Sequence, residues 1–102
     1  MFATIRRYDG VDTNRTDEVI RKVGETLVPQ LRELEGFGGY YAIEGGDGVL
    51  SSFGLFESEA QADEAAKLAA SWVKTEKLES VLPNPPRITS GKVIAHEKAL
   101  VA

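Results

Sequence analysis

The sequence predicts a single α+β domain in which four strands and two helices follow one another in the order βαββαβ. Apolar and polar residues alternate near both ends of the chain and in two central runs, as in strands. A glycine-rich turn joins the two central runs, and a segment with apolar residues at helical spacing lies on either side of them. The expected fold is a four-stranded antiparallel sheet with both helices on one face, formed by residues 1–102. Because the strands are apolar on both sides, we expect a homodimer through the open sheet face.

The composition is that of an ordinary globular protein, with 42% hydrophobic residues, 27% charged residues and a mean hydropathy of -0.20. A net charge of -4 argues against a nucleic-acid partner, and the absence of cysteine excludes disulfides and thiolate chemistry. No apolar stretch is long enough to span a bilayer, and the basic pair Arg6 and Arg7 follows the first apolar residues, the reverse of a secretory signal. We therefore expect a cytoplasmic protein without a membrane partner.

The first strand is expected at Phe2–Tyr8, with Arg6 and Tyr8 on one face and Ile5 and Arg7 on the other. Asp-Gly follows it directly and ends the alternating pattern. Phe2 and Thr4 share the face of Arg6 and Tyr8, and Ala3 shares that of Ile5 and Arg7.

The first helix is expected to begin at Thr13 or Asn14, either of which can cap its first turn, and to continue to residue 34. Pro29 interrupts the helical pattern because it lacks a backbone donor and clashes with the preceding turn, which predicts a kink within residues 24–28. The residues of the apolar stripe recur at three- and four-residue spacing: Ile20, Val23, Leu27, Leu31 and Leu34.

Two strands joined by a tight turn are expected at residues 37–43 and 49–57. Residues 44–48 read Glu-Gly-Gly-Asp-Gly, and Gly and Asp tolerate the positive φ angles that tight hairpins need. In the later strand Phe53 faces one side and Phe56 the other, so this strand is expected to lie between two layers.

A capping box predicts the start of the second helix, because Ser58 is followed three residues later by Gln61. The proline-rich residues 83–86 form a loop that leads into a last strand from residue 87 to about 96. Residues 97–102 are expected to form either a tail or an extension exchanged between subunits. The stripe of the second helix begins with small side chains and ends with larger ones: Ala62, Ala65, Ala66, Ala69, Trp72 and Val73.

Two segments of this chain resemble a known family. Residues 29–40, PQLRELEGFGGY, resemble the passage from helix end to second strand in the antibiotic biosynthesis monooxygenase-like domain, and residues 56–62, FESEAQA, resemble the segment before its second helix. This domain belongs to the ferredoxin-like dimeric α+β barrel proteins, and the resemblance covers nearly the whole chain. It implies that two sheets join into a barrel across a homodimer, with a small molecule held between each sheet and its helices.

The resemblance implies no single activity, because the family holds cofactor-independent quinone-forming oxygenases, heme-degrading enzymes, isomerases and proteins without an assigned reaction. The heme-degrading pattern combines an Asn on the first strand with a Trp and a His in or after the second helix. Only Trp72 matches that pattern, so heme degradation is not expected. No cofactor is expected, and a chain with one His and no Cys is not expected to hold a metal ion.

The candidate site is an aromatic and cationic pocket for a planar acidic ligand. Cofactor-independent oxygenation of a phenol requires that a proton be removed and the resulting anion be stabilised. His96 or Tyr41 would take the proton, and Arg6 or Arg7 would hold the developing oxyanion. The candidate catalytic residues are His96, Arg6 and Tyr41. The candidate substrate-binding residues are aromatic or cationic: Trp72, Tyr8, Tyr40 and Arg87.

Each candidate also has a plainer interpretation. His96 can be a polar strand residue, Trp72 a core residue, and the pair Arg6 and Arg7 a solvated strand end or part of an interface. Three functions therefore stay open: an oxygenase for a small aromatic or phenolic substrate, a noncatalytic binding protein, and a structural dimer. An enzyme predicts a cavity with a perturbed titratable group, a binding protein predicts the cavity alone, and a structural dimer predicts a filled core.

Overall fold

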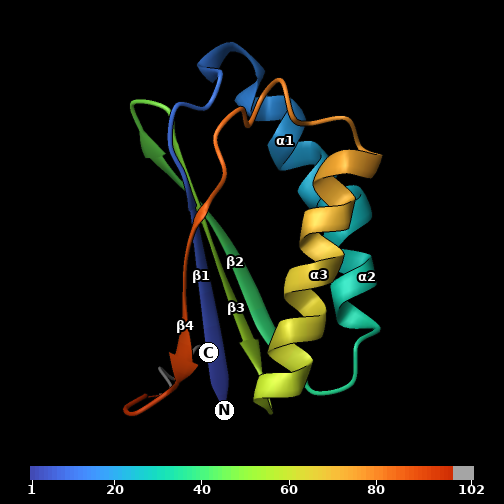
Figure 1. Ribbon diagram of the computed structural model, residues 1–102, viewed down its shortest axis with the longest axis vertical. Coiled ribbons are helices and arrows are strands. Elements are labelled where there is room, and N and C mark those ends of the chain that lie inside the picture. The colour runs from blue at the N-terminus through green and yellow to red at the C-terminus, as the bar shows by residue number, and fades with distance from the viewer. Residues whose placement is uncertain (98–102) are drawn as a thin grey trace, which may run out of the picture.

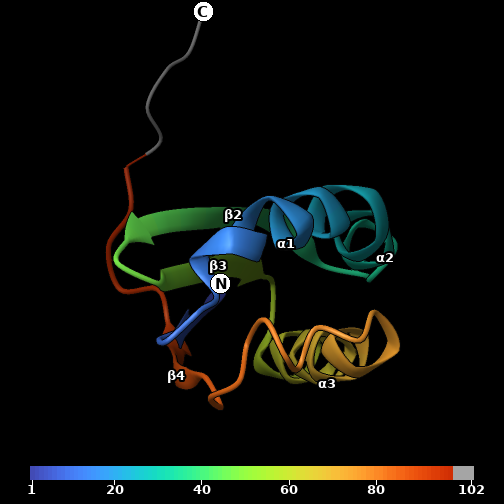
Figure 2. The same ribbon diagram turned by 90° about the horizontal axis from the view of Figure 1, so that it is seen from above.

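The computed structural model describes residues 1–97 and has the expected βαββαβ order. Four antiparallel strands form one sheet in the spatial order β2-β3-β1-β4. Both helical regions pack on the same face of this sheet, which confirms the predicted fold class (Figure 1; Figure 2). Residues 98–102, part of the expected tail or exchanged extension, lie outside the described residues. The strands are β1 (Phe2–Tyr8), β2 (Phe37–Gly46), β3 (Val49–Phe56) and β4 (Arg87–Lys92).

The strand register brings side chains of three neighbouring strands, β1, β3 and β2, beneath the helices. Arg6 of β1 pairs with Ser52 of β3, and Thr4 pairs with Gly54. Gly54 also pairs with Tyr40 of β2. Side chains at paired positions, and at positions two residues apart, project to the same face of a sheet. Arg6, Ser52 and Tyr40 therefore all face the helices.

The first helical region is interrupted close to Pro29, as predicted. The Val28 N–H donates to the carbonyl of Val23, five residues back, which is the bonding pattern of a π-helical turn. Pro29 follows directly, at a helix start where its missing N–H costs little. The kink expected within residues 24–28 is thus confirmed. The region consists of η1 (Thr13–Arg15), α1 (Thr16–Lys22), the π-helical turn η2 (Val23–Leu27) and α2 (Val28–Arg32).

Two details of this region correct the sequence interpretation. The cap is Asp12 rather than Thr13 or Asn14, because the Asp12 Oδ1 accepts from the Asn14 N–H at 3.1 Å. Ile20 is 48% exposed, whereas Val19 is buried. The π-helical turn contains one residue more than an α-helical turn, so residues four positions apart stay on the same face of the helix. Counted back from Leu27 in steps of four, the stripe therefore begins at Val19 and not at Ile20.

The β2–β3 hairpin is tighter than the sequence suggested. The strand expected to end at residue 43 continues to Gly46, and Asp47 and Gly48 alone form the turn. The φ angles of Gly46, Asp47 and Gly48 are 80°, 51° and 76°. Gly and Asp tolerate this left-handed region, which matches the twist of the paired strands.

The helix α3 (Glu59–Thr75) begins at the predicted capping box. The Ser58 Oγ accepts from the Gln61 N–H at 3.4 Å, and the Gln61 Oε1 accepts from the Ser58 N–H at 3.2 Å. After α3, Leu78 and Val81 are fully buried and extend the core beyond the end of the helix. These two core residues lie in an irregular segment without periodicity, so no sequence pattern predicts them.

The edge strand β4 is shorter than predicted. The expected strand covers residues 87–96, but strand pairing ends at Lys92, with one further bond from the Val93 N–H to the Met1 carbonyl at 2.9 Å. β4 runs antiparallel to β1, and Lys92, its last paired residue, lies opposite Phe2, the first residue of β1. His96 therefore lies beyond the sheet, which corrects its expected place on the last strand.

The sheet face opposite the helices carries large apolar side chains. Ile5, Tyr41 and Ile43 are 40%, 63% and 55% exposed on this face. Ile5 pairs with Phe53, and Phe53 pairs with Tyr41, so these three side chains form one row across β1, β3 and β2. Within residues 1–97, no helix is both long and apolar enough to cross a membrane.

Candidate functional site

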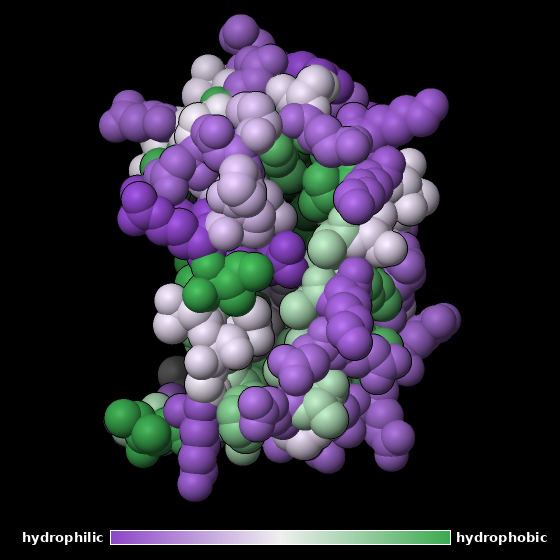
Figure 3. All heavy atoms as spheres, in the orientation of Figure 1, coloured by the Kyte–Doolittle hydropathy of each residue, from purple (hydrophilic) through white to green (hydrophobic). Residues whose placement is uncertain are grey.

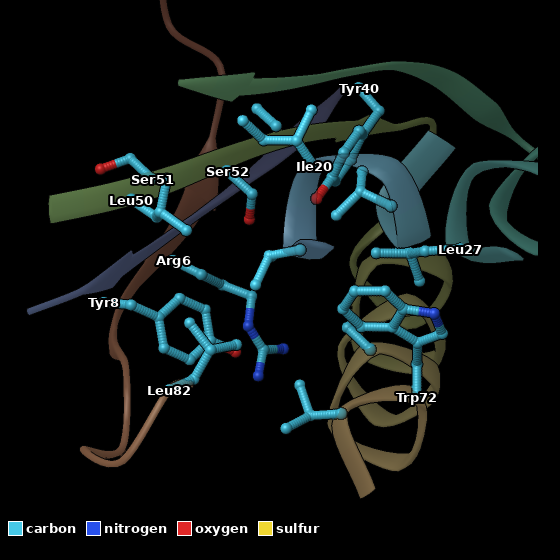
Figure 4. A pocket seen from close by; sticks show the side chains of 15 residues that line it. Arg6, Tyr8, Ile20, Leu27, Tyr40, Leu50, Ser51, Ser52, Trp72 and Leu82 are labelled. Atoms are coloured by element: carbon cyan, nitrogen blue, oxygen red, sulfur yellow. The ribbon is translucent and has the colours of Figure 1, made fainter. Parts of the chain in front are cut away.

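A cavity of about 60 Å³ lies between the helix-facing side of the sheet and the two helical regions. We call it the Trp72 cavity, because the indole of Trp72 forms its wall on the α3 side (Figure 4). Ile20 and Ala42 also line it and are exposed, so the cavity opens to solvent beside them. It is narrower than sites for drug-sized ligands, and a ligand of one or two rings would displace side chains at this open end. Most of the other lining side chains are apolar or aromatic, among them Tyr8, Val19, Val23, Leu27, Tyr40, Leu50 and Leu82, and the polar ones include Arg6 and Ser52.

Arg6 supplies the positive charge of this cavity. Its side chain is 8% exposed, its Nη1 donates to the Ala66 carbonyl of α3 at 3.2 Å, and its Nε is buried without a hydrogen-bond partner. Neither of the ion pairs found within residues 1–97 includes Arg6, and no Asp or Glu is among the described residues that line the cavity. A buried guanidinium with an unused donor is costly unless an acceptor binds to it. Arg6 is therefore a buried cation of this cavity that has no acidic partner among the described residues that line it.

Tyr40 and Ser52 line the same cavity as Arg6, and in Figure 4 the Arg6 guanidinium extends toward Tyr8 and Leu82 while the two hydroxyls lie on its other side. Burial raises the pKa of Tyr40 above its usual 10.0, while a hydrogen bond with Ser52 opposes part of this rise. Tyr40 is consequently protonated at neutral pH, so it serves as a hydrogen-bond donor and not as a base. Arg6, Tyr40 and Ser52 are thus polar residues that line both this cavity and its neighbour along α3.

The indole of Trp72 is fixed on the other side of the cavity. It is 5% exposed, and its Nε1 donates to the Thr26 Oγ1 at 2.7 Å. Thr26 belongs to η2, and its hydroxyl donates in turn to the Lys22 carbonyl at 2.8 Å. Trp72 is therefore both a core residue and a wall of the cavity.

A second cavity of about 40 Å³ adjoins the first along α3, and we call it the alanine cavity. Arg6, Tyr40 and Ser52 line both cavities, so they stand at the boundary between them. Figure 3 shows that the molecule is hollowed between the sheet and α3, with weakly hydrophobic side chains along the helix side of the hollow. The remaining lining residues of the alanine cavity are mostly small or apolar: Ala62, Ala65, Ala66, Ala69, Thr4, Gly54, Leu31 and Phe56.

The structure brings together some of the predicted site residues and separates others. Tyr41 alternates with its neighbour and faces the free side of the sheet, Arg87 is exposed on the edge strand, and His96 is exposed beyond the end of that strand. These three residues therefore do not share one pocket with the others, which corrects the expectation of a single pocket. The roles of Tyr41, Arg87 and His96 stay predictions. The predicted residues that line the Trp72 cavity together are Arg6, Tyr8, Tyr40 and Trp72.

Three residues of the site were not predicted from the sequence: Ser52, Thr26 and Leu82. For Ser52 a signal exists, because alternation along its strand places it on the same face as Phe56. Thr26 and Leu82 reach the site through the π-helical turn and the loop after α3, which no local pattern predicts. Within residues 1–97, no three His, Cys, Asp or Glu side chains are grouped so that they could hold a metal ion.

Several solved structures share this fold. The NE2512 protein of unknown function from Nitrosomonas europaea matches with a TM-score of 0.77 at 17% identity, over 98% of this chain and 95% of that chain. A monooxygenase from the gene ActVA-Orf6 of Streptomyces coelicolor, in complex with the ligand Nanaomycin D, matches with a TM-score of 0.69 at 18% identity, over 99% and 91% of the two chains. A dimeric ferredoxin-like protein from an uncultured marine organism matches with a TM-score of 0.73 at 13% identity, over 97% and 92%.

These likenesses show that the chain has the ferredoxin-like α+β fold of these proteins. Within that class, the fold is that of the antibiotic biosynthesis monooxygenase-like proteins, so the resemblance seen in the sequence is confirmed at the level of the fold. No family model matches the sequence, and no curated protein matches it either. Because one fold supports many activities, function has to be argued from the site.

Proposed function

We propose that this protein is a homodimer that binds a small phenolic compound as its anion in the Trp72 cavity and promotes its oxygenation by molecular oxygen without a cofactor. The observation that carries the proposal is the buried Arg6, whose Nε has no partner within the protein. The Streptomyces coelicolor monooxygenase of the same fold holds the small molecule Nanaomycin D, which supports a small-molecule role.

Arg6 favours the ionised form of a bound phenol, because a positive charge in a poorly solvated site lowers the pKa of an acid beside it. The proton leaves to solvent as the phenol binds, so the cavity needs no basic side chain of its own. Tyr40 and Ser52 donate to the same oxygen. The indole of Trp72 and the side chain of Leu27 enclose the ring and exclude water.

An electron-rich phenolate can react with oxygen directly. The phenolate passes one electron to O₂, and the two radicals then form a C–O bond at the ring carbon para to the phenolate oxygen. Protonation of the terminal oxygen gives a hydroperoxide, and loss of water breaks the O–O bond and removes the hydrogen at that carbon. One phenol and one O₂ thus give one quinone and one water, so the substrate supplies every electron that O₂ receives.

The homodimer is proposed to form through the free face of the sheet. The row of Ile5, Phe53 and Tyr41 lies at the centre of this face, and exposed apolar surfaces of this kind mark interfaces in soluble proteins. The protein of the same fold from an uncultured marine organism is described as dimeric, which supports this assembly.

Oxygen uptake with 1-naphthol tests the proposal. Wild-type protein is expected to raise oxygen consumption above the buffer rate and to form 1,4-naphthoquinone in equal amount to the oxygen consumed. Arg6→Met is expected to lose at least about 90% of this activity, because the variant loses transition-state stabilisation equal to the contribution of one charged hydrogen bond. Arg21→Met removes an exposed arginine of α1 and is expected to keep the activity.

A noncatalytic binding protein is the second candidate function. It is favoured by the lining of the Trp72 cavity, in which the described residues include no His, Asp or Glu to act as a base and Tyr40 holds its proton firmly. This function predicts that 1-naphthol binds in an Arg6-dependent manner while oxygen consumption stays at the buffer rate. If 1-naphthol neither binds nor raises oxygen consumption, both functions are wrong.

A further inference from the structure

The Trp72 cavity and the alanine cavity meet at Arg6, and we infer that the site selects phenolic anions that carry one short apolar group beside the charged oxygen. This inference rests on the proposed function and names the substrate class of the same site. The ring lies in the Trp72 cavity, the oxygen binds Arg6, and the short group fills the alanine cavity.

The position of the short group follows from the boundary between the cavities. Arg6, Tyr40 and Ser52 line both of them, so an oxygen that accepts from these groups lies where the two meet. On an aromatic ring, the carbon next to the C–O carbon carries the substituent that lies closest to that oxygen. When the ring occupies the Trp72 cavity, a group at this ortho position is directed into the alanine cavity.

The size of the short group follows from the volume of the alanine cavity. A volume of about 40 Å³ admits a small group such as methyl. Ala62, Ala65 and Ala69 form the α3 side of this cavity, and their short side chains cannot extend to fill it. The space consequently persists until a ligand group enters it.

The chemistry of the short group follows from the walls. Among the described residues, Thr4 is the one polar side chain that lines the alanine cavity away from the boundary. Leu31 and Phe56 lie across from the alanines and are buried. A hydroxyl or charged substituent would lose its hydration there without gaining enough partners, so an alkyl group is favoured.

Small residues on α3 by themselves account only for close packing of the helix on the sheet. The unpartnered Nε of Arg6 is a separate observation that points to a ligand, because an unused buried N–H of a charged group costs more than a small void. The Ala66 carbonyl accepts from the Arg6 Nη1 at 3.2 Å and also lines the alanine cavity, so it holds the guanidinium against this space.

Binding of three naphthols under anaerobic conditions tests the inference on the wild-type protein. Isothermal titration is expected to show that 2-methyl-1-naphthol binds about four-fold more tightly than 1-naphthol, the gain from burying one carbon-sized group. The tert-butyl analogue, 2-tert-butyl-1-naphthol, exceeds the alanine cavity and is expected to bind at least about ten-fold more weakly than 1-naphthol. Equal or weaker binding of the methyl compound overturns the inference.

A variant that fills the alanine cavity provides the second test. Ala65→Val adds two methyl groups at a buried position and is expected to abolish the preference for the methyl compound over 1-naphthol. Ala70→Val, at an exposed position of the same helix, is the matched control and keeps the preference. A preference that survives in Ala65→Val also overturns the inference.

The ligand series on wild-type protein decides the question even if Ala65→Val does not fold. Failure of the proposed function has a different signature. If none of the naphthols binds, or if Arg6→Met binds 1-naphthol as tightly as wild type, the proposed site itself is wrong. If 1-naphthol binding depends on Arg6 but shows no methyl preference, the site stands and only its selectivity for a short ortho group is refuted.

Discussion

The indole N–H of Trp72 donates to the hydroxyl of Thr26 at 2.7 Å, and this bond joins α3 to the π-helical turn η2. The Thr26 hydroxyl donates its own hydrogen to the Lys22 carbonyl at 2.8 Å, so its orientation is fixed by two bonds. One wall of the Trp72 cavity is therefore held in place by the widened turn that precedes Pro29.

Replacement of the acceptor tests this bond. Thr26→Val leaves the buried indole N–H without a partner and is expected to lower the free energy of unfolding by about 1–3 kcal/mol, measured by urea denaturation. Thr26→Ser keeps the hydroxyl and should retain most of the stability. Thr75→Val, at an exposed site in the last turn of α3, should change it by no more than about 0.5 kcal/mol. Equal stability of Thr26→Val and wild type would show that the bond contributes nothing.

Truncation of the indole separates its two roles. Trp72→Ala removes a buried aromatic side chain and is expected to lower the free energy of unfolding by about 3–5 kcal/mol. Because the same ring lines the Trp72 cavity, the folded variant should also bind 1-naphthol at least about ten-fold more weakly, measured by titration at a temperature well below its unfolding midpoint. A loss of stability with unchanged binding would leave Trp72 as a core residue alone.

The sequence predicts the order of the elements because the signals for it are local. Ser58 and Gln61 are three residues apart, and the effect of Pro29 falls on the turn directly before it. The errors arise where distant parts of the chain decide the outcome. The end of β4 depends on where β1 begins, and the exposure of Ile20 depends on the widened turn that follows α1.

The candidate site shows the same division. Alternation along β1 is enough to place Arg6 and Tyr8 on one face, and helical spacing is enough to predict that Trp72 faces the sheet. The sequence does not distinguish Tyr40 from Tyr41, because both faces of this strand are aromatic and the pairing with β3 decides which side chain points inward. The unpartnered Nε of Arg6 depends on tertiary packing and leaves no trace in the sequence.

A contact between Gly36 and Gln61 links the end of α2 to the start of α3. The φ of Gly36 is 78°, and a Cβ at this position would overlap the Gln61 side-chain amide that completes the capping box. Gly36→Ala is therefore expected to lower the free energy of unfolding by about 1–2 kcal/mol for the left-handed backbone, with a further loss for the displaced cap.

The double variant Gly36→Ala/Gln61→Ala isolates this contact. Without the amide the overlap is relieved, so the loss of stability should be smaller than the sum of the two single losses by at least about 0.5 kcal/mol. Urea denaturation of all four proteins measures the coupling. Additive losses would mean that Gly36 and Gln61 act independently.

The buried phenol of Tyr40 predicts a dependence of stability on pH. Burial raises its pKa above 10.0 in the folded state, so the folded protein holds this proton more tightly than the unfolded chain. The resulting stabilisation is complete below the unfolded pKa and is lost as the pH rises above about 10 toward the folded pKa. Urea denaturation from about pH 9 to 11 should show a steeper decline for wild type than for Tyr40→Phe. Parallel declines would contradict a raised pKa.

The free face of the sheet predicts the state of assembly. Wild-type protein at micromolar concentration should have about twice the 11.1 kDa mass of one chain in static light scattering. Ile5→Lys places a charge in the row with Phe53 and Tyr41, and an unpaired ammonium buried there costs several kcal/mol, so this variant should have the mass of one chain. Ala70→Lys adds the same charge to an exposed position of α3 and should stay dimeric. A single-chain mass for wild type would refute the homodimer, whereas a dimeric Ile5→Lys would show that the interface lies on another surface.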